Sequence, residues 1–264
     1  MCSIKDAKRI VVKVGTSTIA HETGRMNLRK IERLVKVLAD IKNSGREVVL
    51  VSSGAIGVGV GKLGLKHKPS DIPTKQAAAA VGQCELMYTY DKLFGEYSHT
   101  VAQVLLTRDV IDDDLRRHNV ENTFCRLLDM GCIPVVNEND TVATDEIECG
   151  GNFGDNDTLS AVVADVCSAD ALILLSDIDG LYTGDPRTDK DARLIEHVTE
   201  ITEEICSLAG GAGSEMGTGG MITKLHAAEI ALKKGITMAI INGATPETLY
   251  DLLEGKAVGT LFMK

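Results

Sequence analysis

The sequence predicts an α/β protein with a mainly parallel central sheet, and two features of its pattern lead to this class. Short β-branched runs alternate with longer segments whose apolar residues recur at helical spacing. Glycine and small polar residues follow most of these runs, which is typical of strands that end in ligand-binding loops. Because parallel sheets bind ligands at the carboxyl ends of their strands, we expect the functional residues in those loops.

The elements follow in order from these patterns. RIVVKV at 9–14 is the first expected strand and stops at Gly15, and apolar residues from Leu28 to Ile41 predict the first helix. A second strand at 47–52 stops at Gly54. The same criteria predict further strands at 100–106, 133–136, 171–175, 237–241 and 258–262, helices at 75–97, 114–130, 158–166, 200–209 and 221–235, and a hairpin or excursion at 178–195.

No linker-like stretch divides the chain, so we expect a single domain over residues 1–264 with a shallow division near residue 170. The net charge of −10 and the scattered basic residues disfavour nucleic-acid binding, and 3% aromatic residues disfavour base stacking. No apolar run reaches membrane-spanning length, which disfavours a membrane partner. Seven cysteines without a CxxC pair are typical of reduced thiols, so we expect a soluble, cytoplasmic protein.

The octet GTGGMITK at 217–224 is the most informative stretch of the sequence. Its glycines permit close approach of an anion, and the first amides of the helix that follows would form a phosphate site. Lys224 lies about one turn into that helix, where it would reach the same anion. The alternative interpretation is a flexible glycine linker before an ordinary helix.

Polar clusters follow four of the expected strands, at 15–17, 52–55, 137–140 and 176–177. Lys13 lies inside the first apolar strand, where a cation is costly unless it meets an anion or extends to solvent. Asp157 ends the segment GDND at 154–157, which begins an expected helix. The alternative interpretation is a first-turn carboxylate that only interacts favourably with the helix dipole. Two lysines with a carboxylate between them are suited to phosphoryl transfer, because charge develops on the transferred group.

Other nucleotide and catalytic motifs have little support. Gly59, Gly61 and Gly64 satisfy GxGxxG, but they begin well past the strand end and prolines follow where a helix should run. The P-loop is absent because Leu63 replaces its hydroxyl residue. The six histidines have no zinc-ligand spacing, and no GxSxG elbow supports a serine hydrolase.

Taken together, the chain resembles the amino acid kinase family, and in particular its members that phosphorylate L-glutamate. The matching segments run in order over nearly the whole sequence: VVKVGTS, SSGAIGVG, AAVGQ, LLTRDV, PVVNENDTVA, GDNDTLSA, LLSDIDGLYTGDPR and GTGGMITKL. The resemblance implies a three-layer α/β/α sandwich. It also implies transfer of the γ-phosphoryl group of ATP, with Mg²⁺, to the side-chain carboxylate of L-glutamate, the first step of proline biosynthesis.

The resemblance also implies roles for individual residues. Lys13 and Lys224 would neutralise the transferred phosphoryl group, and Asp157 would hold the two lysines in register. The amino-acid lobe would be 1–170 and the nucleotide lobe 171–264. Glutamate would be bound by Ser53, Gly54, Asp140 and Asn156, and ATP by Lys13, Ser176, Asp177, Thr218, Gly219, Gly220, Met221, Ile222, Thr223 and Lys224, while the metal ligands stay unassigned.

Two departures from the family pattern affect what else is expected. Many members continue into a C-terminal PUA domain, whereas this sequence ends at TLFMK, so we expect the kinase domain alone. The stretch 148–153 is longer than the pattern, which bears on feedback inhibition by proline. We further expect a homo-oligomer, a dimer or tetramer, and glutamyl phosphate reductase as a possible partner. The competing hypotheses are a catalytically silent sensor of nucleotide or amino acid and a kinase of the same fold that acts on another acid.

Overall fold

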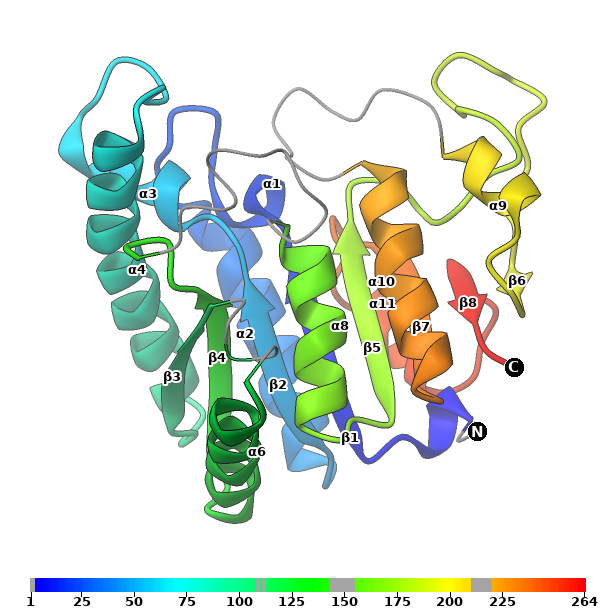
Figure 1. Ribbon diagram of the computed structural model, residues 1–264, viewed down its shortest axis with the longest axis horizontal. Coiled ribbons are helices and arrows are strands. Elements are labelled where there is room, and N and C mark those ends of the chain that lie inside the picture. Colours follow the sequence, from blue (N-terminus) through cyan, green and yellow to red (C-terminus); the bar gives the residue numbers. More distant parts are fainter. Residues whose placement is uncertain (1–2, 108–109, 111–112, 143–154, 210–219) are drawn as a thin grey trace.

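The computed structural model describes residues 3–107, 110, 113–142, 155–209 and 220–264. Its centre is an eight-stranded sheet in the order β3-β4-β2-β1-β5-β7-β8-β6, with helices on both faces (Figure 1). All the neighbouring strands are parallel except β7 and β8, which are antiparallel. The expected α/β class with a mainly parallel sheet is confirmed.

The strands are β1 (Arg9–Val14), β2 (Glu47–Ser52), β3 (Val101–Leu106), β4 (Ile133–Glu138), β5 (Ala171–Ser176), β6 (His197–Val198), β7 (Thr237–Asn242) and β8 (Thr260–Phe262). The helices are η1 (Ile4–Asp6, 3-10), α1 (Thr16–Ile19), α2 (Leu28–Asn43), α3 (Ala55–Leu63), α4 (Ile72–Gly95), α6 (Asp114–Asp129), α8 (Asn156–Val166), α9 (Glu203–Leu208), α10 (Met221–Lys233) and α11 (Thr248–Leu253).

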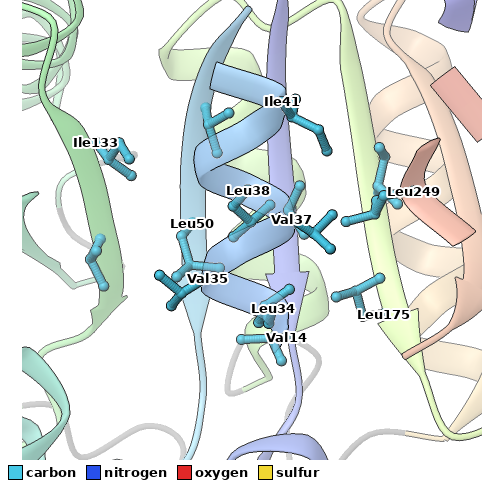
Figure 2. Close-up of a cluster of buried hydrophobic side chains, with 14 of the residues drawn as sticks. Val14, Leu34, Val35, Val37, Leu38, Ile41, Leu50, Ile133, Leu175 and Leu249 are labelled. Atoms are coloured by element: carbon cyan, nitrogen blue, oxygen red, sulfur yellow. The ribbon is translucent and has the colours of Figure 1, made fainter. Parts of the chain in front are cut away.

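The alternation of side chains along β1 divides the core between the two faces of the sheet. Ile10, Val12 and Val14 pack with α2, α4 and α11, whereas Val11 packs with α6, α8 and α10. Figure 2 shows α2 on the first face, with Leu34, Val35, Leu38 and Ile41 directed toward β1 and β2. Because side chains alternate along a strand, Lys13 points to the same face as Val11, where α8 and α10 lie.

Local signals in the sequence explain most element boundaries. Asn27 caps α2 by accepting a hydrogen bond from the Lys30 amide, and Asp71 caps α4 by accepting one from Thr74. Each fully buried aliphatic side chain of α2 contributes about 1.5–3 kcal/mol relative to exposure. The cap of α2 lies directly before its amphipathic repeat, whereas the cap at Asp71 begins α4 three residues before the expected start at residue 75.

Three short helices, α1, α3 and α11, were not expected from the sequence. Gly59 and Gly61 lie inside α3, and Gly64 ends this helix with φ of 66°. The Cβ of an alanine at Gly59 would lie 1.8 Å from the Ala78 carbonyl oxygen, so Gly59 permits close packing of α3 on α4, whereas Gly61 packs against the backbone of Gly24. The other two helices span four and six residues, too few for a helical repeat to stand out.

The expected excursion at 178–195 contains an antiparallel bridge between Tyr182 and Leu194. The division near residue 170 falls between α8 and β5, yet β1 pairs with β5 along its length, so the sheet is continuous there. Among the described residues, no helix is long and apolar enough to cross a membrane. The described cysteines, Cys84, Cys125, Cys132, Cys167 and Cys206, are free thiols.

Candidate active site

Lys13, Asp157 and Lys224 meet at the carboxyl edge of the sheet. Lys13 Nζ lies 2.7 Å from Asp157 Oδ1, and Lys224 Nζ donates a 2.9 Å hydrogen bond to Asp157 Oδ2. The three residues come from β1, from the first turn of α8 and from the first turn of α10, and α8 and α10 lie side by side on one face (Figure 1). The structure therefore brings together the three residues that the sequence singled out for catalysis.

Burial makes this cluster electrostatically demanding. Asp157 is 1% exposed, Lys13 9% and Lys224 8%. Burial alone would raise the pKa of Asp157, but attraction by Lys13 and Lys224 outweighs it and holds that pKa well below its usual range. The carboxylate is thus ionised at neutral pH, and the cluster of two ammonium groups and one carboxylate carries a net positive charge.

The geometry around Asp157 leaves some bonding capacity unused. Lys13 Nζ forms an ion pair with Oδ1, but this buried oxygen accepts no hydrogen bond of standard geometry from any described residue. Oδ2, in contrast, also lies 2.9 Å from Thr223 Oγ1. Lys13 is held at Oδ1 by this ion pair, and its remaining N–H groups are suited to an anion that enters the site.

Asp155 positions Asp157 by capping α8. Its Oδ1 accepts hydrogen bonds from the amides of Asp157 at 2.6 Å and Thr158 at 3.0 Å. Burial and the neighbouring charge of Asp157 raise the pKa of Asp155. The two carboxyl groups, two residues apart, thus have pKa values shifted in opposite directions by their surroundings.

The N-terminus of α10 lies next to the lysines. Gly220 begins the helix in an extended conformation with φ of −85° and gives no side-chain cap, so the first amides are available to an anion. Thr223 Oγ1 lies 2.8 Å from the Gly220 carbonyl, Met221 is half-buried, and Ile222 is exposed. Thr218 and Gly219, also expected to bind ATP, lie outside the described residues.

A cavity of about 710 Å³ lies at the N-terminus of α8, where Asn156 forms part of its wall. Ser53, Gly54, Asp140 and Asn156, the four residues expected to bind glutamate, all line it. Gly54 adopts φ of 99°, a left-handed conformation that favours glycine, and begins α3. Since Asn156 immediately precedes Asp157, the cavity borders the lysine–carboxylate cluster.

The strand order separates two kinds of candidate residue. Those expected to bind glutamate follow β2 and β4 or begin α8, whereas Ser176 ends β5 and Asp177 follows it, on the other side of β1. Ser176 is buried and Asp177 exposed, and Ser176 Oγ donates to Asp177 Oδ1 at 3.3 Å. Lys13 on β1 therefore lies between the two groups.

Sequence reasoning assigned no role to several residues of the cavity. Asn137 lines it at the end of β4, and its Oδ1 accepts a 3.1 Å hydrogen bond from Asn156. Its place in the polar cluster after the fourth strand was the signal that could have identified it. Thr16, which begins α1 and belongs to the polar cluster after the first strand, also lines the cavity. His21 and Lys66 line it from loops, and no local sequence pattern predicts that these loops reach the cavity.

The model of the amino acid kinase family matches residues 8–242. The chain belongs to the amino acid kinase family. Curated relatives include the glutamate 5-kinases of Clostridium perfringens, 60% identical over 99% of this chain and 97% of the relative, and Clostridium tetani, 58% identical over 98% and 96%. The glutamate 5-kinase of Listeria innocua is 55% identical over 98% and 94%. These family members are thus nearly the same length as this chain.

Solved structures show the same fold at low sequence identity. UMP kinase from Bacillus anthracis matches with a TM-score of 0.65 and 17% identity, over 97% of this chain and 96% of that one. An isopentenyl phosphate kinase matches with a TM-score of 0.64 and 18% identity, over 97% and 100%. The three-layer amino acid kinase fold expected from the sequence is therefore confirmed.

Proposed function

We propose that this chain is an ATP-dependent kinase that phosphorylates the side-chain carboxylate of L-glutamate to give L-glutamyl 5-phosphate. One observation carries the proposal: two buried lysines converge on one buried aspartate, between a cavity lined by the expected amino-acid ligands and the open N-terminus of α10. The glutamate 5-kinase relatives, up to 60% identical over nearly the full chain, support the same reaction. Its product would enter proline biosynthesis.

The reaction follows from the charges in the site. An oxygen of the glutamate side-chain carboxylate attacks the γ-phosphorus, the bond from that phosphorus to the β,γ-bridging oxygen breaks, and ADP leaves. A free glutamate side chain has a pKa of about 4.3, so the nucleophile is already ionised and no general base is required. Lys13 and Lys224 stabilise the negative charge on the transferred group because their amines are fixed beforehand by Asp157.

The positive groups of the site are suited to the phosphates of Mg·ATP, and the described residues offer no cluster of metal ligands. They contain no group of three or more His, Cys, Asp or Glu side chains that could hold a metal. Mg²⁺ is commonly bound through substrate phosphates with few protein ligands, and when bound it neutralises phosphate charge. Lys13, Lys224 and the α10 amides would bind the phosphate oxygens, and Ser176 and Asp177 at the end of β5 would bind the rest of the nucleotide.

The cavity offers a donor and an acceptor set suited to an amino acid. Asp140 would bind the ammonium group, and Ser53, Gly54 and Asn156 would bind the remainder of glutamate. L-Aspartate has a shorter side chain than L-glutamate, and N-acetylglutamate has no free ammonium group. Each would therefore lose one of these contacts with the cavity. Specificity thus depends on a few contacts in this cavity.

A single assay tests the function. The protein is incubated with Mg·ATP and, separately, L-glutamate, L-aspartate or N-acetylglutamate, and hydroxylamine is added to trap any acyl phosphate as its hydroxamate. We expect hydroxamate with L-glutamate. If only another acid gives hydroxamate, that acid is the substrate in place of L-glutamate. Tight ATP binding in calorimetry without any hydroxamate would identify a catalytically silent sensor.

Three finer expectations belong to the same proposal. Self-association into a dimer or tetramer is the pattern of the family that the chain resembles. Glutamyl phosphate reductase is a plausible recipient, because an acyl phosphate is labile in water. A cytoplasmic location agrees with the free thiols among the described cysteines and with the need for ATP. The longer stretch 148–153, which bears on proline feedback, lies outside the described residues.

A further inference from the structure

Gln83 is a buried polar residue that has no role in the phosphoryl transfer described above. It lies in the alanine-rich part of α4 and is only 9% exposed. Its Oε1 accepts a 3.0 Å hydrogen bond from Nδ2 of Asn137, which is 3% exposed at the end of β4. A buried amide pair of this kind is costly to break, because each group would lose its partner away from water.

The hydrogen bonds continue from Asn137 to the cavity wall. Asn137 Oδ1 accepts a 3.1 Å hydrogen bond from Asn156 Nδ2, which also donates a 2.7 Å hydrogen bond to Ser53 Oγ. We call Gln83, Asn137, Asn156 and Ser53 the amide relay. Its inner end is Gln83, and its outer end is formed by Asn156 and Ser53, which both line the cavity.

The direction of the relay fixes what its outer end can offer a ligand. A side-chain amide has two N–H hydrogens, and Asn156 uses both within the relay, so its remaining group is the acceptor Oδ1. Ser53 accepts from Asn156, so its own hydroxyl hydrogen remains to be donated. The wall therefore presents an acceptor suited to an ammonium group beside a donor suited to a carboxylate.

We propose that Gln83 is a positioning residue that sets this polarity, and the inference rests on the proposed function of the cavity. Because Gln83 presents its acceptor Oε1, Asn137 donates to Gln83 and turns its own Oδ1 toward Asn156, which donates in turn. If Gln83 presented a donor instead, Asn137 and Asn156 would have to reverse. The cavity would then meet the Nδ2 group of Asn156, which repels an ammonium group.

The packing of α4 keeps Gln83 in place. Gly82, its neighbour, contacts α3 so closely that an alanine Cβ would lie 1.8 Å from the Ala55 carbonyl oxygen. α4 can therefore neither slide nor rotate without separating from α3. Gln83 is held at one height relative to the end of β4.

Gln83→Met tests the proposal because it keeps the side-chain length and removes the acceptor. Dissociation constants are measured by calorimetry for L-glutamate and for glutarate, the same dicarboxylate without the ammonium group. We expect the preference of the wild type for L-glutamate over glutarate to fall about 10-fold or more, as for the loss of one hydrogen bond to a charged group. The kcat for L-glutamate should change far less than its KM.

Two further variants separate positioning from packing. Gln83→Glu keeps acceptor oxygens and should keep the preference for L-glutamate, even if Gln83→Met fails to fold. Thr89→Val removes a polar group at the same 9% exposure on the same helix, outside the relay, and should leave the preference unchanged. Thermal unfolding of each variant shows whether α4 stays packed.

The outcomes are distinguishable. An unchanged preference in folded Gln83→Met, or a lost preference in folded Gln83→Glu, overturns the role of Gln83 and leaves the kinase assignment intact. A wild type that neither binds L-glutamate nor forms its hydroxamate overturns the proposed function and the positioning role with it.

Discussion

At the residue scale, the site depends on the balance of charge around Asp157. Burial opposes its ionisation, and the ion pairs with Lys13 and Lys224 reverse that tendency. The lysines in turn depend on the carboxylate, because two buried ammonium groups without a counterion would repel each other. The three side chains therefore act as one unit for stability and, in the proposed reaction, for catalysis.

Lys224→Ala should lower kcat by about 10²–10³-fold, since it removes one preorganised positive group from the transferred phosphoryl. Hydroxamate formation from L-glutamate at saturating Mg·ATP measures the effect. Lys233→Ala is the matched control, because this lysine is also on α10 but is exposed and pairs only with Glu229 among the described residues. Near-normal turnover of Lys224→Ala would remove this residue from the mechanism.

Asp157→Asn should change how stability depends on pH. The folded state holds the pKa of Asp157 below its unfolded value, so its ion pairs stabilise the fold above that value and are lost as pH falls toward the folded pKa. The wild type should thus lose stability more steeply than the variant between about pH 5 and pH 3. At pH 7 the variant should be less stable by about 3–5 kcal/mol.

Urea unfolding at several pH values between 7 and 3 measures both effects. Parallel curves for the wild type and Asp157→Asn would show that the ion pairs contribute no pH-dependent stability. That result would contradict the charge balance described for the cluster.

At the element scale, helix ends and helix contacts position the side chains of the site. α8 begins at the cap made by Asp155, α10 begins at Gly220, and α3 begins at Gly54, all at the carboxyl edge of the sheet. Such helix N-termini favour anions, which agrees with phosphate and carboxylate ligands. The contact of α3 with α4 sets the wall of the cavity.

Asp155→Asn and Asp155→Ala should differ in stability at pH 7. Asparagine caps as well as aspartate and carries no charge, and the pKa of Asp155 is raised by burial, so Asp155→Asn should be at least as stable as the wild type. Asp155→Ala loses the bonds to the Asp157 and Thr158 amides and should be about 1 kcal/mol less stable. Denaturant unfolding of the two variants at pH 7 measures this difference. Equal free energies of unfolding would mean that the cap contributes nothing to stability.

Gly82→Ala should destabilise the fold by about 1–3 kcal/mol, because the new Cβ would overlap the α3 backbone. The shift of α3 should also weaken L-glutamate binding, since Ala55 and Ile56 of α3 line the cavity. Gly95→Ala, on the same helix with nothing within 4 Å of the new Cβ, should be neutral or slightly stabilising. Thermal unfolding and glutamate KM are the readouts, and a Gly82→Ala protein as stable as Gly95→Ala would contradict the close contact.

At the scale of the whole molecule, one sheet carries both halves of the proposed site. β2 and β4 bring the amino-acid ligands, β5 brings Ser176 and Asp177, and β1 with Lys13 joins them. The polarity of parallel strands places all these ends at one edge. Substrate and nucleotide can therefore approach the lysines from opposite sides.

Sedimentation should show at least a dimer, as expected from the family that the chain resembles. Analytical ultracentrifugation over a range of protein concentrations measures this, with activity followed at the same concentrations. A monomer that is fully active would contradict the expectation, because self-association would then have no part in forming the site.

Much of the fold could be predicted from the sequence because its signals are local. The short apolar runs of β1, β2 and β5 and the amphipathic repeat of α2 identified these elements within a few residues. α3 was not predicted because its glycines resemble a loop, and only tertiary contacts explain two of them: Gly59 packs against Ala78 of α4, and Gly61 packs against Gly24. The candidate residues at strand ends were identified for the same local reason, and Asn137 carried the same signal, whereas the contact of Gln83 with Asn137 joins residues that are distant in the chain.

The sequence by itself determined the alternation of strands and helices, the residues at the carboxyl edge and the presence of a lysine on a buried strand, since each depends on neighbours along the chain. Only the tertiary structure decided that Lys13 and Lys224 converge on Asp157 and that Gln83 reaches Asn137. These contacts join β1, β4, α4, α8 and α10, and their distances follow from how the helices pack on the sheet.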